Sequence, residues 1–298
     1  MPSLAPISLQ DTGSDAADGI FPRYVRHEAG TLLIDREPRR VAVISTGQLD
    51  CATTLGVVPI AATQGHGTGV FEPYLTHFHP RHAGALGSLG DLGDRKEPDI
   101  DVFRALQPDL IFMNRAGDRH DNYAALAEIA PVVVTRGKGF NWQIDFLLMA
   151  HALGRVEQAQ AFLRRFRADS AAARPRRGTV SFVQSNGRRL TIMGRQSFVG
   201  TIAEDMGLVR PEAQRFDATS RHIERDEIAA VDADWVIYAG QGVGSDTIRS
   251  MPGWSNLPAV RAGRAVEVDY QAFFNNAGAT AARIVLDQLI GLFRSKNV

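Results

Sequence analysis

A run of apolar, mostly β-branched residues at 41–45 (VAVIS) limits most strongly how this chain can fold. An unbroken apolar strand of this kind is typical of a parallel sheet buried on both faces. The sequence predicts further strands at 57–63, 110–113 and 132–134, with helices at 49–56, 100–106 and 123–129. Because strands and helices alternate, we predict an open α/β sheet with right-handed crossovers. Ahead of this region, residues 24–27 and 31–35 flank Ala29-Gly30 and predict a β-hairpin.

The second half of the chain repeats the alternation. It predicts strands at 179–183, 234–238 and 265–268 and helices at 198–206 and 225–231. The tripeptides Leu55-Gly56-Val57 and Met206-Gly207-Leu208 also occupy corresponding places in the two halves. Because a domain usually has about 100–200 residues, a chain of 298 residues is expected to form two α/β lobes of related design.

Residues 156–173 separate the two halves and contain neither Gly nor Pro. Apolar side chains recur at Ala159, Phe162, Leu163 and Phe166, which is the spacing of one helix face. At 1.5 Å per residue, this helix would be about 27 Å long and could reach from one lobe to the other, allowing only small closing motions. We therefore predict a tail at 1–22, a first lobe at 23–154, a bridging helix at 155–175 and a second lobe at 176–298.

Composition argues against several classes of function. Lys and Arg total 33, as do Asp and Glu, so the zero net charge gives no general attraction to nucleic acid or to an anionic membrane. The single cysteine, Cys51, can form neither an intrachain disulfide nor a cysteine-based zinc site. The glycine-rich segment 240–244 follows a predicted strand but lacks the spacing of a dinucleotide fingerprint, and no Walker loop or nucleophile elbow is present. We therefore expect a protein that is not an enzyme, with a dinucleotide-binding enzyme as the alternative class.

The N-terminal region gives no targeting signal. Residues 1–20 lack a basic start followed by an apolar core, and the sequence has no apolar run of about 18 residues. We expect either a cytoplasmic protein or a mature sequence without its signal peptide.

Residues 97–111 (EPDIDVFRALQPDLI) carry a more specific pattern, in which an acid-Pro-Asp start leads into a helix and then into a Pro-Asp-Leu-Ile strand. This segment resembles the signature of the helix-backbone (class III) periplasmic solute-binding proteins, whose ligands are iron siderophores, haem and cobalamin. Similar segments occur in family order at 39–43, 55–60, 129–133, 254–260 and 261–266, so the resemblance covers nearly all of residues 24–293.

The resemblance implies two Rossmann-like α/β lobes bridged by a single long α-helix, with the ligand cleft between the lobes at loops that follow strand carboxyl ends. It also implies an extracytoplasmic protein, periplasmic or on the cell surface, that captures a ferric siderophore and delivers it to the permease subunits of an ABC importer. We expect a monomer with no covalent cofactor and no nucleic-acid partner, whose ligand is the Fe(III)–siderophore complex. Haem or cobalamin binding is the alternative within the same fold.

Four residues of the first lobe are candidates for the ligand site. A ferric siderophore presents charged oxygens, which favour Arg donors, and apolar linkers, which favour aromatic walls. By resemblance, Arg95 stands where hydroxamate-binding relatives carry a ligand-gripping Arg, and Arg115 directly follows a predicted strand. Tyr74 lies in a long predicted loop, and His66 lies between two glycines that permit close approach. For both arginines, a solvated surface position is the alternative.

The second lobe offers aromatic and basic candidates. They are Arg195 and Phe198 near a helix start, Phe216 and Arg221 before the next helix, and Phe273, Phe274 and Asn275 after the last predicted strand. Some catecholate-binding relatives carry an Arg near Phe198, so the resemblance favours a hydroxamate or mixed chelate over a tris-catecholate. Exposed consecutive Phe residues are typical of a binding surface, and burial against the final helix is the alternative.

Four histidines of one segment, His66, His77, His79 and His82, raise the alternative of direct Zn²⁺ binding. In helix-backbone metal-ion binding proteins the ligands come from both lobes, whereas the second lobe here offers only His222. We therefore expect no metal site. For haem, Tyr74 and His66 are the candidate axial ligands.

Two acids are candidates for docking to a permease. Relatives place one acid on each lobe to pair with permease arginines, and by motif these positions fall on Asp101 and Asp226. The family residue is usually Glu, so the shorter Asp departs from the pattern. The alternative is an acid that complements a helix dipole.

Overall fold

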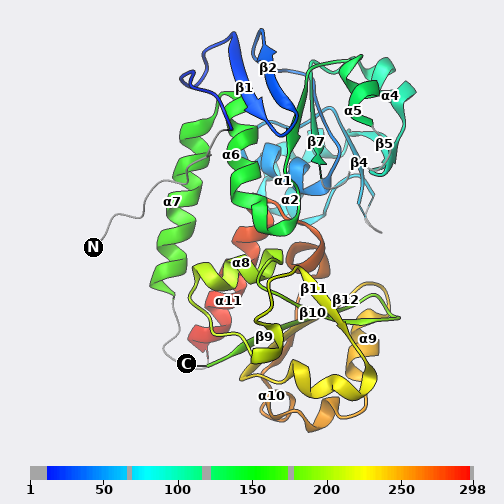
Figure 1. The fold of residues 1–298 in the computed structure, drawn as a ribbon, viewed down its shortest axis with the longest axis vertical. Helices are drawn as coiled ribbons and strands as arrows, with labels where there is room; N and C mark the ends of the chain where they lie inside the picture. Colours follow the sequence, from blue (N-terminus) through cyan, green and yellow to red (C-terminus); the bar gives the residue numbers. More distant parts are fainter. Residues whose placement is uncertain (1–11, 66–68, 116–121, 174–177, 296–298) are drawn as a thin grey trace. The chain divides into compact units, whose positions relative to one another are not determined.

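The computed structural model describes residues 12–65, 69–115, 122–173 and 178–295 (Figure 1). The chain divides into two compact units. Unit 1 comprises Met1–Arg165 with Gly278–Thr280, and unit 2 comprises Phe166–Ala277 with Ala281–Val298. None of the helices in the described ranges is both long and apolar enough to cross a membrane.

Unit 1 contains a six-stranded sheet in the order β6-β5-β4-β3-β7-β8. All neighbours are parallel except the edge pair β5 and β6, which confirms the predicted α/β sheet. Its strands are β3 (Val41–Val43), β4 (Ala61–Gln64), β5 (Gly90–Asp94), β6 (Glu97–Pro98), β7 (Leu110–Asn114) and β8 (Val132–Thr135). The predicted hairpin is also present, as the antiparallel pair β1 (Arg23–His27) and β2 (Gly30–Ile34).

Helices cover both faces of this sheet. The helices of unit 1 are α1 (Thr46–Thr54), α2 (Tyr74–Phe78), η1 (Pro80–His82), α3 (Ala83–Leu86), α4 (Ile100–Leu106), α5 (Asn122–Ala127), η3 (Gly139–Asn141) and α6 (Trp142–Leu153). Phe103 of α4 and Leu126 of α5 pack into one apolar cluster with Ile111 and Val132 of the strands. Helices α1 and α6 pack together on the other side of the sheet (Figure 1).

Three sequence predictions in unit 1 need correction. Helix α1 begins at Thr46 rather than at residue 49, because the Ser45 hydroxyl accepts a hydrogen bond from the backbone N–H of Gln48 and caps the helix. The strand expected at 57–63 begins only at Ala61, and Pro59 in this stretch has no N–H to donate to a sheet. The segment that contains Tyr74, expected as a loop, forms α2, η1 and α3.

Unit 2 contains a five-stranded sheet in the order β11-β10-β9-β12-β13. Strand β12 runs parallel to β9 and β13, whereas β10 is antiparallel to both β9 and β11, so this sheet is mixed. Its strands are β9 (Val180–Ser185), β10 (Leu190–Met193), β11 (Ser220–Ile223), β12 (Trp235–Gly240) and β13 (Ala265–Glu267). Residues 220–223, expected in a loop that includes Arg221, are therefore an edge strand.

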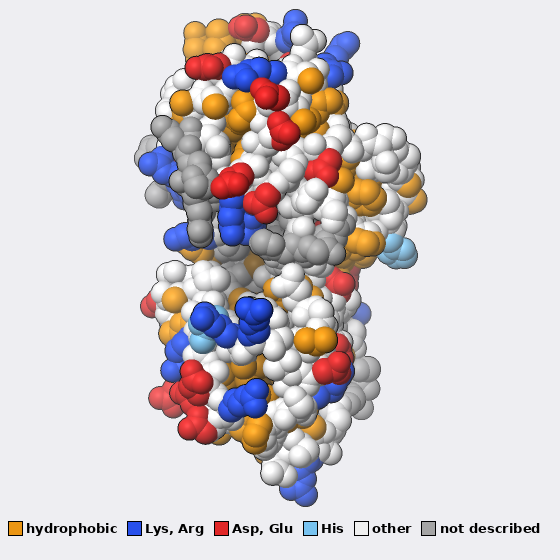
Figure 2. All heavy atoms as spheres, turned by 90° about the vertical axis from the view of Figure 1, so that its right-hand side faces the viewer, with side chains coloured by type: hydrophobic (Ala, Val, Ile, Leu, Met, Phe, Trp, Pro, Cys, Tyr) orange, Lys and Arg blue, Asp and Glu red, His pale blue; other side chains and the backbone are white. Residues whose placement is uncertain are grey.

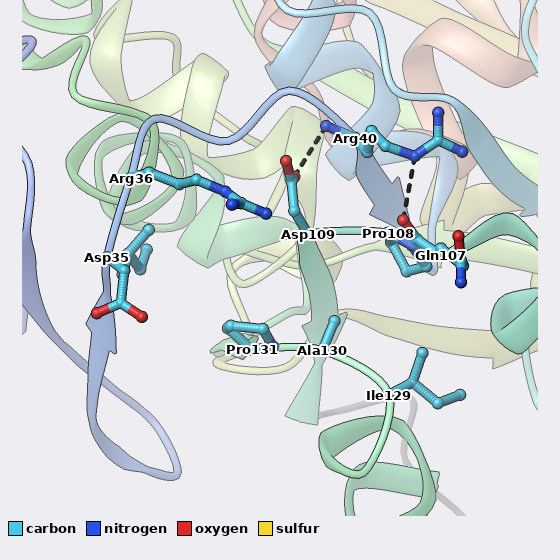
Figure 3. Close-up of a pocket in the computed structure, with 10 residues that line it drawn as sticks. Asp35, Arg36, Arg40, Gln107, Pro108, Asp109, Ile129, Ala130 and Pro131 are labelled. Carbon is cyan, nitrogen blue, oxygen red and sulfur yellow. Dashed lines mark hydrogen bonds between the residues drawn. The ribbon is translucent and has the colours of Figure 1, made fainter.

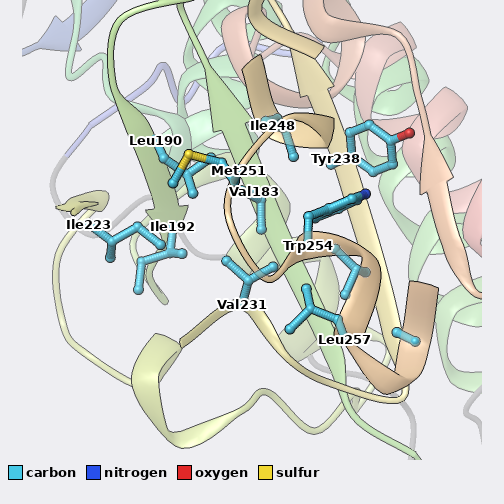
Figure 4. Close-up of a cluster of buried hydrophobic side chains, with 12 residues drawn as sticks. Val183, Leu190, Ile192, Ile223, Val231, Tyr238, Ile248, Met251, Trp254 and Leu257 are labelled. Carbon is cyan, nitrogen blue, oxygen red and sulfur yellow. The ribbon is translucent and has the colours of Figure 1, made fainter. Parts of the chain in front are cut away.

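Short helices surround the second sheet. They are α8 (Phe198–Asp205), η4 (Glu212–Gln214), η5 (Arg225–Val231), α9 (Gly244–Arg249), η6 (Trp254–Asn256), α10 (Pro258–Arg261), η7 (Gln271–Asn275) and the longer α11 (Ala279–Ser295). A buried cluster joins strands and helices on one side, with Tyr238 of β12 edge-to-face against Trp254 at 5.1 Å between ring centroids (Figure 4). On α11, Phe293 meets Trp235 of β12 in the same geometry at 5.9 Å.

The helix predicted at 156–173 is α7 (Val156–Ala172). Its first turn is capped by Asp18, whose carboxylate accepts hydrogen bonds from the backbone N–H groups of Val156 and Glu157, each at 2.7 Å. The boundary between the two units falls within α7, between Arg165 and Phe166. Its function as a bridge, and the four segment boundaries expected from the sequence, stay predictions.

Candidate functional site

The carboxyl ends of the five parallel strands of unit 1 meet at one edge of the sheet. Three of these ends are directly followed by an arginine: Arg95 after β5, Arg115 after β7 and Arg136 after β8. Ligands of open α/β sheets bind at this edge. We refer to it as the arginine edge of unit 1. Arg95 and Arg115 are among the candidates predicted from the sequence, whereas Arg136 is not.

A buried polar network lies under the arginine edge. The Gln48 amide N–H₂ of α1 donates to Asn114 Oδ1 and to Thr135 Oγ1, each at 3.0 Å. Asn114 in turn donates to Ser45 Oγ at 3.1 Å, and Thr135 also donates to Asn114. Asn114 and Thr135 are register partners on β7 and β8, directly before Arg115 and Arg136. The network therefore fixes the strand ends from which the two arginines project.

Glu28, in the turn of the N-terminal hairpin, contacts both of these arginines. Its carboxylate accepts a hydrogen bond from Arg136 Nε at 2.8 Å, and its backbone oxygen accepts one from Arg115 Nη1 at 2.6 Å. Beneath Arg136, the Asp145 carboxylate of α6 accepts hydrogen bonds from the backbone N–H groups of Arg136 and Gly137, at 2.9 and 2.8 Å. Burial raises the pKa of Asp145 to about 7 despite these bonds. The ends of β7 and β8 thus bring the guanidinium groups of Arg115 and Arg136 together with the carboxyl groups of Glu28 and Asp145.

Tyr74 is held by a buried carboxylate. Its hydroxyl donates to Asp50 Oδ2 at 2.9 Å, and Asp50, which is fully buried on α1, also accepts a 2.7 Å hydrogen bond from the backbone N–H of Thr280. His79 Nε2 lies 2.9 Å from the Thr280 hydroxyl, and burial lowers the pKa of His79. Tyr74 would have to give up the Asp50 bond to serve as an axial haem ligand, so the haem alternative gains no support from this residue. His66 lies outside the described residues.

Unit 2 carries a basic pocket of about 260 Å³ where β9 ends and β10 begins. We call it the basic pocket of unit 2; its lining includes Arg188, Arg189, His222, Arg225 and Thr247. Arg188 and Arg189 stand in the turn after β9, where their backbone N–H groups donate to Asn186 Oδ1. Figure 2 shows Lys and Arg side chains grouped with a His on the face of unit 2 that it presents.

The side chains of this pocket keep donors available. Arg189 Nη1 lies 3.4 Å from His222 Nε2, and His222 Nδ1 lies 2.9 Å from the Thr191 hydroxyl. Among the described residues, the guanidinium groups of Arg188 and Arg225 have no hydrogen bond or ion pair. The turn lies at the carboxyl end of β9, which pairs in parallel with β12, so the pocket occupies the edge where α/β sheets bind ligands. Of the residues that line this pocket, the sequence points only to His222, in the metal-ion alternative, and not to Arg188, Arg189 or Arg225.

The other candidates of unit 2 lie elsewhere. Arg195 and Phe198 follow the end of β10, whereas the basic pocket precedes its start. Arg195 is already close to two carboxylates, at 3.8 Å from Glu204 and 3.6 Å from Asp217. Phe216 is half-buried against the apolar core, with the guanidinium of Arg221 6.0 Å from its ring centroid. Phe198 is buried at the first position of α8, so the expected aromatic wall is largely part of the protein interior.

The consecutive Phe residues after β13 divide in their exposure. Phe273 is fully buried, which is the alternative that the sequence left open for this residue. Phe274 is half-buried, with its ring centroid 6.1 Å from that of Phe273. Asn275 donates to Gln271 Oε1 at 2.6 Å within η7. Phe274 and Asn275 stay candidates for ligand contact, since they follow the carboxyl end of a parallel strand.

A pocket of unit 1, of about 570 Å³, lies at the edge of the sheet opposite the arginine edge, before β3, β7 and β8 (Figure 3). Its polar groups mostly stabilise the fold. Asp109 accepts hydrogen bonds from the backbone N–H groups of Arg39 and Arg40, and the Arg40 side chain donates to the carbonyls of Leu106 and Gln107 at the end of α4. This pocket therefore does not resemble the two arginine-lined edges.

Comparison with known proteins decides the family. Residues 41–272 match the family described as periplasmic binding protein. The chain belongs to this family. A curated relative, the probable siderophore-binding lipoprotein YfiY of Bacillus subtilis, is 26% identical, and the match covers 95% of this chain and 91% of YfiY. The Fe(3+) dicitrate-binding periplasmic protein FecB of Escherichia coli is 23% identical over 92% of this chain and 91% of FecB.

Two solved structures share the fold. Staphylococcus aureus SirA, crystallised with staphyloferrin B, has a TM-score of 0.78 and 21% sequence identity, and the match covers 91% of this chain and 98% of SirA. The petrobactin-binding protein YclQ of Bacillus subtilis has a TM-score of 0.75 over 90% of this chain and 97% of YclQ. The two-lobed α/β architecture expected from the resemblance is thus confirmed.

The two acids predicted from the sequence for docking to a permease are both exposed. Asp101 lies in the first turn of α4 and forms a 2.9 Å ion pair with Arg104 one turn later. Asp226 lies in the first turn of η5. Their pairing with a permease stays a prediction.

Direct metal binding gains no support from the part of the chain that the structure describes. There, no three His, Cys, Asp or Glu side chains come together in a way that could hold a metal ion. His79 and His82 are neighbours, with ring centroids 6.4 Å apart, but His77 packs against Phe78.

Proposed function

We propose that this protein is an extracytoplasmic substrate-binding protein that captures an anionic ferric chelate and passes it to the permease of an ABC importer. The observation that carries the proposal is the placement of arginines at the ligand-binding edge of the sheet in each unit, Arg115 and Arg136 in one and Arg188 and Arg189 in the other. The proposal agrees with two relatives, the probable siderophore-binding lipoprotein YfiY and the Fe(3+) dicitrate-binding periplasmic protein FecB. In this proposal the protein works outside the cytoplasm, as the family name implies, and catalyses no reaction.

The chemistry of a ferric chelate fits guanidinium donors. Carboxylate, hydroxamate and catecholate oxygens around Fe³⁺ keep partial or full negative charge and point outward in fixed directions. An Arg presents several N–H donors in one plane and forms short, charge-assisted hydrogen bonds to such oxygens. The Asn186 turn holds the backbone of Arg188 and Arg189, so the Cα positions from which the two guanidinium groups reach a ligand are already set.

The class of chelate is a finer proposal. The preference for hydroxamate or mixed chelates expected from Phe198 stays a prediction, and the buried position of Phe198 weakens its basis. The basic pocket of unit 2 favours chelates with charged oxygens, such as carboxylates. Haem and cobalamin remain alternatives that the same titration decides.

The test is isothermal titration calorimetry with ferric citrate, a ferric trihydroxamate, a ferric tris-catecholate, haem and cobalamin. Calorimetry is preferable to tryptophan fluorescence because Trp142, Trp235 and Trp254 are all buried. We expect at least one ferric chelate to bind, and the Arg188→Ala/Arg189→Ala double variant to bind it ten- to a hundredfold more weakly, which corresponds to about 1.5–3 kcal/mol for charge-assisted bonds.

The matched control is Arg294→Ala, which removes an exposed cation from the last turn of α11. It should leave the affinity unchanged. Binding of none of the ferric chelates by the wild-type protein would contradict the proposed function, and equal loss in the control would mean that only net charge matters.

A further inference from the structure

Glu28 is fixed in place by β8. The hairpin turn that carries it forms two hydrogen bonds with one residue, since the Glu28 N–H donates to the Val134 carbonyl at 3.1 Å and the Val134 N–H donates to His27 Nδ1 at 3.2 Å. Burial lowers the pKa of His27, which favours the neutral ring that can accept this bond. The position of Glu28 is therefore set by its own backbone N–H and by the His27 side chain rather than by its own side chain.

From this position Glu28 reaches both arginines in two different ways. Its backbone oxygen accepts from Arg115, while its carboxylate pairs with Arg136. The side chain of Glu28 is 23% exposed and that of Arg136 is 36% exposed, so the pair is partly shielded from solvent screening. The carboxylate thus offsets one of the two positive charges at the ends of β7 and β8.

Both guanidinium groups keep donors for a ligand. Among the hydrogen bonds to described residues, the Arg136 guanidinium donates only from Nε and the Arg115 guanidinium only from Nη1. An anion that approaches the free nitrogens of Arg136 meets the Glu28 carboxylate on the same guanidinium group. Each additional negative charge on the ligand therefore gains attraction from the arginines and also meets repulsion from Glu28.

We infer that Glu28 is a specificity-determining residue that positions Arg115 and Arg136 and limits the negative charge of the chelate that they accept. This inference rests on the proposed function. Because the link to Arg115 is made by the backbone, a change of the side chain alters the charge without removing that link. The structure thus separates the positioning of Arg115 from the charge balance of the site.

Glu28→Gln is the sharpest test. Gln has nearly the same shape, and its amide oxygen can still accept a hydrogen bond from Arg136 Nε, but it carries no charge. Three ferric chelates serve as probes: a trihydroxamate, in which three anionic groups neutralise Fe³⁺; a tris-catecholate, in which six phenolate oxygens leave a net charge of about −3; and citrate. Dissociation constants are measured by calorimetry at low and at physiological salt.

We expect Glu28→Gln to strengthen tris-catecholate binding about tenfold relative to trihydroxamate binding, with a steeper dependence on salt, since removing a nearby like charge acts in proportion to ligand charge. The control Glu37→Gln removes the same charge from an exposed pair with Arg155, at 3.5 Å, and should leave the ratio unchanged. Glu28→Asp keeps the charge with a shorter side chain and should keep the wild-type ratio.

The possible outcomes are distinct. An unchanged ratio in Glu28→Gln, with wild-type binding intact, overturns this inference and leaves the proposed function standing. An equal weakening of all chelates means that Glu28 is only structural, and it also overturns the inference. If Glu28→Asp shifts the affinity ratio as much as Glu28→Gln does, the effect comes from the position of the side chain rather than from its charge. This outcome also overturns the inference. If the wild-type protein binds no ferric chelate, the proposed function fails and the inference with it.

Discussion

The Asp50 carboxylate and the backbone N–H of Thr280 form a 2.7 Å hydrogen bond between residues 230 positions apart in the sequence. Asp50 is fully buried on α1, and Thr280 lies in the first turn of α11. A carboxylate at this place satisfies an N–H group that has no partner within the helix and complements the helix dipole. Tyr74 completes the arrangement through its bond to the second oxygen of Asp50.

Tyr74→Phe is expected to lower the free energy of unfolding by about 1 kcal/mol, since it removes one hydrogen bond and leaves Asp50 with its other partners. Asp50→Ala should cost about 3 kcal/mol or more, because it leaves the Thr280 N–H and the Tyr74 hydroxyl without this acceptor. Urea unfolding followed by circular dichroism measures both. Ferric-chelate affinity of Tyr74→Phe provides a second result: a loss of more than tenfold with unchanged stability would assign Tyr74 to the ligand site instead.

Gly278→Ala should also disturb this contact. A Cβ atom on Gly278 would lie 2.2 Å from Asp50 Cγ and 2.3 Å from its Cβ, closer than atoms can approach. We expect a loss of about 2 kcal/mol or more in the free energy of unfolding. Gly278 directly precedes α11, and Gly291→Ala within α11 is the control, because its Cβ would meet nothing within 4 Å. It should stabilise the protein by about 0.5–1 kcal/mol through helix propensity, and equal effects of the two variants would contradict the packing argument.

Local patterns of the sequence were sufficient for much of the fold. The apolar run that becomes β3, the hairpin, and the helix that becomes α7 each follow from residues close together in the chain. Strand β11, with the residues Ser220, Arg221 and His222, was expected as a loop because it is short, polar and at a sheet edge, where pairing depends on β10 rather than on its own composition. Polar edge strands of this kind carry little local signal.

The candidate site was less predictable because its contacts join distant residues. Arg115 could be identified since it follows an obvious strand, but Arg136 is paired with a residue 108 positions away, and no local pattern indicates that contact. The basic pocket likewise depends on β10 and β11 pairing in the register that sets Leu190 opposite Ile223. Conversely, Phe198 and Phe273 are predicted as ligand contacts because they are aromatic, but both side chains are buried in the protein interior.

A buried arginine in unit 2 gives a prediction for stability. Arg210 donates from Nε to the Val180 carbonyl at 2.9 Å and from Nη2 to the Met193 carbonyl at 2.8 Å, and its guanidinium carbon lies 4.6 Å from the Phe182 ring centroid. Lys cannot reproduce this planar fork, so Arg210→Lys is expected to lower the free energy of unfolding by about 2–3 kcal/mol. Arg261→Lys on α10 is the control and should change it by less than about 0.5 kcal/mol. Thermal unfolding that is equal for both variants would refute the structural importance of Arg210.

The pKa of Asp145, raised by burial from 3.8 to about 7, predicts a specific dependence of stability on pH. Because the folded protein holds this proton more tightly than the unfolded chain, the Asp145 contribution to the free energy of unfolding falls as pH rises from about 4 to 7 and is constant above that range. The effect is at most about 4 kcal/mol, and less where solvent reaches the carboxyl group.

Asp145→Asn cannot ionise, so the difference in stability between wild type and variant should change between pH 5 and pH 8, in favour of the variant at pH 8. Urea unfolding at both pH values measures this difference, and taking the difference cancels the contributions of other carboxylates, such as Asp15, whose pKa is lowered by its hydrogen bond to Arg26. A difference that is the same at both pH values would show that Asp145 is ionised across the whole range in the folded protein.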